Sequence, residues 1–160
     1  MPFPIEVHYP IRSNQKLVIR TDRDWNQSIS PIHISNDCFH FEVPDNTPFY
    51  WKPCLIQDES LYWSVGSNYL NIPEIESIAQ IWPCFFSTSG RLSERLCIPN
   101  PKSPLRHFIR IYYPPGYDEN TLKRYPTLYM HDGQNVFLKE EAYIGEEWGA
   151  DETMQQLNIM

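Results

Sequence analysis

The clearest alternation of apolar and polar positions lies at residues 37–43, where the sequence reads DCFHFEV. On an extended chain Phe39, Phe41 and Val43 share one side, and polar side chains occupy the other. Successive side chains of a strand point to opposite faces, so a period of two over this length predicts a half-buried antiparallel strand. A Pro-Asp-Asn turn ends it.

Other short runs in the first part of the chain have the composition of strands and are separated by turn residues. These runs are residues 16–21, 48–56, 60–65 and 78–86. Pro53 inside the second run indicates a sheet edge or a bulge, because proline has no N–H for the ladder. Several short strands separated by turns predict an antiparallel β-sandwich over residues 1–86.

The sequence changes character after residues 87–90, a Ser-Thr-Ser-Gly stretch that we interpret as a linker. Further strands are expected at residues 91–98, 106–113 and 125–130. The last of these is a short apolar run after a proline, which is typical of a buried parallel strand. A helix is predicted from about Trp148, because acidic residues stand in its first turn and Met154 and Leu157 form an apolar stripe.

Charge and composition narrow the classes of partner. The 160 residues carry a net charge of −7, which argues against nucleic acid because phosphate binding requires clustered Lys and Arg. We find no secretory signal after Met1 and no run long enough to cross a bilayer, so we expect a soluble, cytoplasmic protein with no membrane partner. The four cysteines lack C-x-x-C pairs and zinc-type spacing, and three of them have apolar or aromatic neighbours, so we interpret them as buried free thiols.

We expect no metal site and no cofactor. His131 and Asp132 are adjacent, but no third ligand stands at a useful spacing from them. His40 and His107 stand on predicted strands opposite apolar neighbours, and we interpret both as solvent-facing residues.

A polar turn at residues 131–135, His-Asp-Gly-Gln-Asn, follows the apolar run 125–130. Glycine permits a sharp bend in the backbone there. Such a turn can point successive backbone N–H groups into a cleft, where they stabilise a developing oxyanion, and losing one donor costs ~3 kcal/mol. We therefore interpret the turn as half of an active site, and the other half is not in the chain.

Three motifs occur in order after residue 90: RIYYPPGY at 110–117, KRYPTLYMHDGQN at 123–135 and GEEWGADE at 145–152. They resemble the esterase branch of the α/β-hydrolases, which includes enterochelin-esterase-like and S-formylglutathione-hydrolase-like proteins. The resemblance implies that residues 91–160 are an incomplete α/β-hydrolase domain, with the first three strands and the first helix of its sheet. The fold class expected for the whole chain is therefore mixed.

The resemblance also implies roles for the turn residues. The backbone N–H groups of Gly133 and Gln134 would form the oxyanion hole, and Glu147 and Trp148 would line the edge of the pocket. The residues that brace the loop would be His131, Asp132 and Asn135. The substrate of the full-length relatives would be a small-molecule carboxylic ester.

This chain has no G-x-S-x-G motif and no serine after Ser103. Without a nucleophile, a base and an acid, acyl transfer has no route. We therefore expect an amino-terminal, truncated part of a carboxylic-ester hydrolase that is inactive alone, and whether this chain is itself an enzyme stays open.

The first part of the chain has a second resemblance, to starch-binding and glycogen-binding β-sandwich modules. It rests on residues 17–20, 24–25, 49–52 and 63–66. Such modules hold sugars on exposed aromatic rings, which implies a sugar platform at Trp25, Trp51 and Trp63. The other interpretation is core packing, because aromatic side chains bury large areas. A carbohydrate-binding module with a vestigial hydrolase segment is thus the alternative function.

Overall fold

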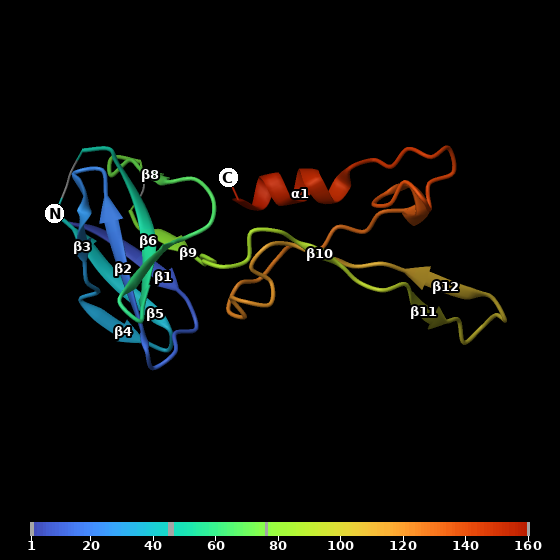
Figure 1. The fold of residues 1–160 in the computed structure, drawn as a ribbon, viewed down its shortest axis with the longest axis horizontal. Helices are drawn as coiled ribbons and strands as arrows, with labels where there is room; N and C mark the ends of the chain where they lie inside the picture. Colours follow the sequence, from blue (N-terminus) through green and yellow to red (C-terminus); the bar gives the residue numbers. More distant parts are fainter. Residues whose placement is uncertain (1, 45–46, 76, 160) are drawn as a thin grey trace. The chain divides into compact units, whose positions relative to one another are not determined.

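The computed structural model describes residues 2–44, 47–75 and 77–159, and its regular structure is mostly β-strand (Figure 1). The chain forms two compact units. Unit 1 consists of Met1–Thr88 and Asp118–Arg124, and unit 2 consists of Ser89–Tyr117 and Tyr125–Met160. The predicted linker at residues 87–90 falls where the first unit gives way to the second.

One sheet of unit 1, the β1 sheet, has four strands in the order β4–β5–β1–β9. Their bounds are His33–Ser35 for β4, Cys38–Val43 for β5, Phe3–His8 for β1 and Ala79–Ile81 for β9. β1 pairs antiparallel with β5, so that Phe3 lies opposite Val43 and His8 opposite Cys38. Its other edge pairs parallel with β9.

The second sheet, the β2 sheet, has the order β3–β2–β6–β7, and β8 also pairs with β6. The bounds are Asp24–Ile29 for β3, Gln15–Thr21 for β2, Phe49–Gln57 for β6, Ser60–Trp63 for β7 and Tyr69–Asn71 for β8. β2 and β6 are antiparallel, from Gln15 opposite Gln57 to Thr21 opposite Trp51. This pair is the longest ladder of the sheet.

The two sheets enclose one hydrophobic core. β5 buries Phe39, Phe41 and Val43 and leaves Glu42 exposed, which confirms the predicted alternation. The largest fully buried core side chains come from both sheets: Ile5, Val7, Phe39, Phe41, Leu17, Ile19, Phe49, Trp51 and Leu55. Each such side chain contributes ~2–3 kcal/mol when it leaves water. Unit 1 is thus consistent with the predicted β-sandwich.

A short segment of the chain, Asp118–Arg124, belongs to unit 1, although the residues on both sides of it in sequence belong to unit 2. Its Asn120 is 1% exposed. The Asn120 side-chain Nδ2 donates hydrogen bonds to the carbonyl oxygens of His8 and Pro83, both at 2.8 Å. These bonds satisfy the half-buried His8 carbonyl and the buried Pro83 carbonyl, and a buried carbonyl without a partner would destabilise the fold.

Unit 2 consists of short ladders, one 3₁₀ helix and one α-helix in its described residues. β10 (Arg91–Leu92) pairs antiparallel with β13 (Tyr112–Tyr113), and β11 (Leu96–Pro99) pairs antiparallel with β12 (Arg106–Ile109). The 3₁₀ helix η1 spans Gly133–Asn135, and α1 spans Ala150–Ile159. The helix predicted from about Trp148 is confirmed.

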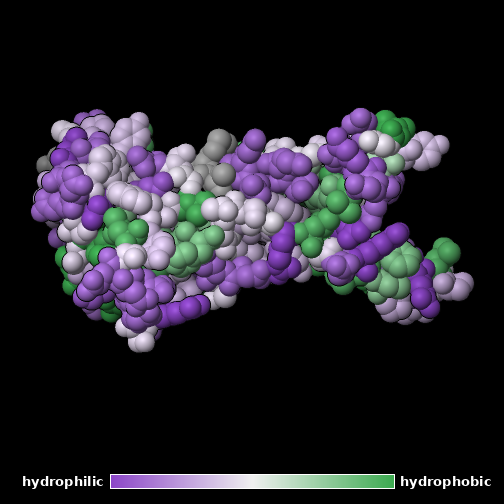
Figure 2. All heavy atoms as spheres, in the orientation of Figure 1, coloured by the Kyte–Doolittle hydropathy of each residue, from purple (hydrophilic) through white to green (hydrophobic). Residues whose placement is uncertain are grey.

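Few hydrophobic side chains of unit 2 are buried. Val136 is the one buried large hydrophobic residue among those of unit 2 whose burial the structure describes. Figure 2 shows hydrophobic residues at the surface near the end that Figure 1 labels β11 and β12. There Leu105 and Phe108 are 70% and 52% exposed.

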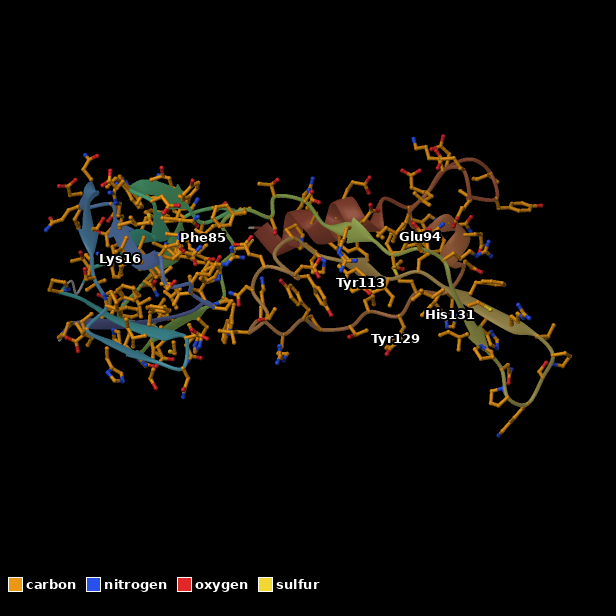
Figure 3. All side chains as sticks on the ribbon, turned by 60° about the horizontal axis from the view of Figure 1, so that its bottom comes forward. Lys16, Phe85, Glu94, Tyr113, Tyr129 and His131 are labelled. Carbon is orange, nitrogen blue, oxygen red and sulfur yellow. The ribbon has the colours of Figure 1, made fainter. Side chains whose placement is uncertain are left out.

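The third strand expected in unit 2 does not form. Residues 125–130 carry no strand, and Leu128 and Tyr129 are 68% and 89% exposed (Figure 3). A buried parallel strand requires a hydrogen-bonded neighbour and helices that cover the sheet. The described part of unit 2 has only antiparallel two-stranded ladders and one α-helix. The predicted α/β-hydrolase part of the fold is therefore wrong.

Candidate functional site

The outer face of the β2 sheet carries two tryptophans and two cations, Trp25, Trp63, Arg20 and Lys52, which we call the tryptophan surface. Residues directly opposite in an antiparallel ladder share a face. Lys52 lies opposite Arg20, and Trp63 lies opposite Cys54, two residues along β6 from Lys52. Arg20, Lys52 and Cys54 alternate with the core residues of β2 and β6, so they and Trp63 face away from the core. Trp25 on β3 belongs to this surface because its ring contacts that of Trp63.

The two tryptophan rings of this surface contact each other edge to face. Their centroids are 5.9 Å apart and their planes meet at 66°. Trp63 is 39% exposed and Trp25 is half-buried, so parts of both rings are open to solvent. The guanidinium carbon of Arg20 lies 5.5 Å from the Trp63 centroid, within the range of a cation–π interaction.

Hydrogen bonds hold the rim of the tryptophan surface in place. Arg20 donates from Nη1 to the Trp25 carbonyl at 2.8 Å and from Nε to the Ser28 hydroxyl at 3.2 Å. Lys52 donates from Nζ to the Gly66 carbonyl at 2.5 Å. Burial lowers the pKa of the Lys52 ammonium group. Because the Arg20 side chain of β2 is hydrogen-bonded to Trp25 and Ser28 of β3, the surface is preorganised for a ligand.

The tryptophan surface also covers part of the fold. Val18 and Cys54 point away from the core but are only 5% and 0% exposed. Burial raises the pKa of the Cys54 thiol to about 11. Trp63 lies directly opposite Cys54 in the ladder, so packing over this buried position is one role of the Trp63 side chain.

Trp51 does not belong to the surface. It lies opposite Thr21 on the inner face of β6 and is 0% exposed. Its indole Nε1–H donates to the side-chain oxygen of Asn71, and its ring lies 5.1 Å from that of Tyr69. A ring without an open face cannot stack on a sugar, so the expected role of Trp51 in a platform is wrong.

The turn at residues 131–135 is exposed over its first four residues. The backbone enters the left-handed region at Asp132, with φ of 52°, and not at Gly133. A Cβ added at Gly133 would meet no atom within 4 Å, so this glycine is not required by packing. Figure 3 labels His131 at the start of the turn, and Gln134 follows Gly133 in η1.

Asn135 ties the turn to the segment that follows it. Its side-chain oxygen accepts from the Tyr143 N–H at 2.9 Å, and its carbonyl accepts from the Trp148 N–H at 2.8 Å. Trp148 is 55% exposed. Glu147 is half-buried, and its Oε2 is buried without a hydrogen-bond partner among the described residues. The predicted loop-bracing and pocket-edge roles stay predictions.

Comparison with known proteins gives no family for the chain. No family model matches it, and no curated protein matches it. Among solved structures, Gamma-CGTASE from alkalophilic Bacillus clarkii matches 51% of this chain at 13% identity, with a TM-score of 0.38. The match spans 14% of that protein, and the likeness carries no argument about function.

The assignment to the α/β-hydrolase esterases is therefore wrong. No family model supports it, the described structure is mostly β-sheet with one short α-helix, and the strand that should precede the turn is absent. The oxyanion hole at Gly133 and Gln134, the ester substrate and the truncated-hydrolase interpretation rested on that assignment. None of them has support in the structure.

The cysteines are free thiols, as the sequence predicted. The expected burial is found for Cys54 alone, because Cys38 and Cys84 are half-buried and Cys97 is exposed. No helix in the described parts of the chain has the length and apolar character needed to cross a membrane.

Proposed function

We propose that unit 1 is a carbohydrate-binding β-sandwich that holds a saccharide on the tryptophan surface. One observation carries the proposal: Trp25 and Trp63 come from different strands, contact each other on an outer sheet face and keep parts of both rings open to solvent. The C–H faces of a sugar ring are apolar and stack on such rings, which bury large areas at low conformational cost.

Polar groups at the rim suit the hydroxyls of a sugar. Arginine has five N–H donors and lysine has three. The bonds from Arg20 to Trp25 and Ser28 use Nε and one N–H of Nη1, and Lys52 donates one bond to Gly66. Donors on both cations therefore remain for hydroxyl oxygens, at positions that the protein already fixes.

The expected ligand is a neutral glucan chain bound with low affinity. The surface is open and offers only two rings for contact with the ligand. These contacts must offset the translational and rotational freedom that the ligand loses on binding, so the affinity is low. A dissociation constant of about 1 mM, equivalent to ~4 kcal/mol, is the expected order. Several sugar units along one chain would raise the apparent affinity by rebinding.

Native electrophoresis in gels that contain soluble α-glucan tests the proposal. The wild-type chain should be retarded, and Trp25→Ala and Trp63→Ala should migrate as they do without glucan. Trp148→Ala is the matched control, because it removes an exposed tryptophan from unit 2. Wild-type mobility that glucan leaves unaltered, together with unchanged tryptophan fluorescence, would overturn the proposal.

Packing and binding predict different outcomes for the same variants. If the tryptophans only cover Val18 and Cys54, Trp63→Ala lowers the free energy of unfolding and no glucan effect exists to be lost. If they bind sugar, the glucan effect disappears in a variant that is still folded at the temperature of the gel. Far-ultraviolet circular dichroism of each variant separates the two cases.

A further inference from the structure

The outer face of the β1 sheet brings four metal-binding side chains together. In the ladder of β1 and β5, Glu6 lies opposite His40 and His8 lies opposite Cys38. Glu6 and His8 are two residues apart, as are Cys38 and His40, so all four side chains share one face. The residues that alternate with them fill the core: Ile5, Val7, Phe39 and Phe41.

Three of these side chains, those of Glu6, Cys38 and His40, are grouped closely enough to hold one ion, and His8 lies beside Glu6 and Cys38. His40 Nδ1 lies 3.3 Å from Glu6 Oε1, and His8 Nε2 lies 3.8 Å from Glu6 Oε2 and 3.8 Å from Cys38 Sγ. The ligand atoms of Glu6, Cys38 and His40 all lie within 4.8 Å of one another. Tetrahedral zinc with bonds of ~2.0–2.3 Å requires ligand atoms ~3.3–3.8 Å apart.

We propose that Glu6, Cys38 and His40 bind a Zn²⁺ ion, and that His8, which lies beside Glu6 and Cys38, moves in to complete the four ligands. One thiolate, two imidazoles and one carboxylate are a donor set that zinc accepts in tetrahedral geometry. Ca²⁺ and Mg²⁺ are excluded as preferred ions, because they take mainly oxygen ligands in larger number. The site is separate from the tryptophan surface, which lies on the other sheet.

Neighbouring side chains orient the ligands. Gln80 on β9 donates from Nε2 to Glu6 Oε2 at 2.6 Å. The His8 ring stacks on Trp82, with centroids 4.7 Å apart and planes at 9°. Partners of this kind fix the rotamers of metal ligands and support the affinity of a site.

The site is accessible to an ion from solvent. The side chains of Glu6, His8 and His40 are 19%, 22% and 32% exposed, and Cys38 is half-buried. They are therefore shielded enough to hold an ion and open enough to admit one. The spacing of ligand residues along the sequence does not predict this site, because the ligands come from two strands about thirty residues apart.

Titration of the chelator-treated full chain with Co²⁺ tests the proposal, because Co²⁺ takes zinc sites and absorbs light. The wild type should give visible bands of four-coordinate cobalt and a near-ultraviolet band from thiolate to cobalt, and Zn²⁺ should remove both. Cys38→Ser should lose the thiolate band, and His40→Ala should bind about 100-fold more weakly. Glu6→Gln keeps the shape of the side chain and should also weaken binding.

The controls are Cys97→Ser, an exposed thiol of unit 2, and His33→Ala, whose ring lies 5.5 Å from that of His40. Both should retain the wild-type spectrum. A wild-type chain that gives no cobalt bands at millimolar Co²⁺ overturns the proposal, as does a thiolate band that survives Cys38→Ser. Zn²⁺ should also raise the melting temperature of the wild type and not that of Cys38→Ser.

Discussion

The Tyr9 hydroxyl donates a hydrogen bond to the carboxylate of Glu119 at 3.2 Å, although the two residues are 110 positions apart in sequence. The same carboxylate accepts from the backbone N–H groups of Phe85, Phe86 and Ser87 at 2.5, 3.0 and 2.9 Å. Burial and the Glu119 charge raise the pKa of Tyr9 above its ordinary value. Glu119 thus joins the first strand, the end of the sandwich and the Asp118–Arg124 segment.

Replacing this carboxylate should destabilise unit 1. Glu119→Gln keeps the size of the side chain but removes the charge and replaces one acceptor oxygen with an amide, so N–H groups lose their partner. We expect a loss of ~1–3 kcal/mol, measured as a lower urea midpoint. Glu42→Gln is the control, because Glu42 is exposed on β5. Equal midpoints for the two variants would contradict the role of Glu119.

Two shielded thiols make unit 1 sensitive to alkali. Burial, as the first cause, raises the pKa of Cys54 and of Cys84 from 9.0 to about 11. Above pH 9 the unfolded chain loses these protons first, so the stability they contribute is present below pH 9 and is lost as pH rises through about 11. The urea midpoint of the wild type should therefore be lower at pH 10 than at pH 8.

The comparison that isolates the thiols is between the wild type and the double variant Cys54→Ala, Cys84→Ala under reducing conditions. Lys52 and Lys123 act in the opposite sense, because burial lowers the pKa of their ammonium groups. The double variant should lose less stability between the two pH values than the wild type. An equal loss in both proteins would show that these thiols do not contribute.

In unit 2, Arg110 binds both carboxylate oxygens of Glu141 and donates to the Ser93 carbonyl at 3.0 Å. The hydrogen bonds from Arg110 lower the pKa of Glu141 below its ordinary value of 4.5. Because the folded-state pKa is depressed, the stabilisation is present above pH 4.5 and is lost as pH falls through the lowered value. Solvent screens this pair, so it contributes less than ~1 kcal/mol.

Exchange of the Ser93 amide, which donates to the Ile111 carbonyl at 2.8 Å, reports on the Arg110–Glu141 pair. At pH 7, and after correction for the intrinsic rate, this amide should exchange up to about 5-fold faster in Glu141→Gln than in the wild type. Glu140→Gln, at an exposed neighbour, should leave it unchanged. An acceleration that persists at acid pH, where Glu141 is protonated in the wild type, would contradict the assignment.

The exposed hydrophobic residues of unit 2 should bind a dye. Tyr129 and Tyr143 are each 89% exposed, and Leu128 is 68% exposed. Exposed apolar side chains attract apolar ligands. The wild type should enhance the fluorescence of an anilinonaphthalene dye, and Leu128→Ser with Tyr129→Ser should reduce it more than Ile75→Ser, a control in unit 1 at 77% exposure. A wild type without enhancement would contradict this.

The strands of the sandwich were predictable where the pattern was local. The runs at 16–21, 37–43, 48–56 and 60–65 correspond to β2, β5, β6 and β7. β1 was missed although Phe3–His8 also alternates, because Pro4 weakens the signal of a strand. The strand expected at residues 125–130 failed for another reason: an apolar run pairs only if the fold supplies a neighbour, and no local pattern contains that information.

The candidate sites show the same division. Trp63 could be recognised as an aromatic residue on a short strand, and Trp51 could have been excluded, because it alternates in phase with Phe49 and Leu55 on the core face. The contact between the Trp25 and Trp63 rings depends on the order of the strands in the sheet, which the local sequence pattern does not contain. The group of Glu6, His8, Cys38 and His40 depends on the register of β1 against β5, which sequence spacing alone does not fix.

The most direct test of saccharide binding follows the indole N–H resonances of the five tryptophans during titration with a linear α-glucan oligosaccharide. We expect the Trp25 and Trp63 resonances to shift together with one midpoint, at millimolar concentration. The resonances of Trp51 in the core and Trp148 in unit 2 should stay unchanged. Saccharide binding on the tryptophan surface would be contradicted if the Trp25 and Trp63 resonances did not move at about 10 mM oligosaccharide. A shift confined to Trp148 would contradict it equally.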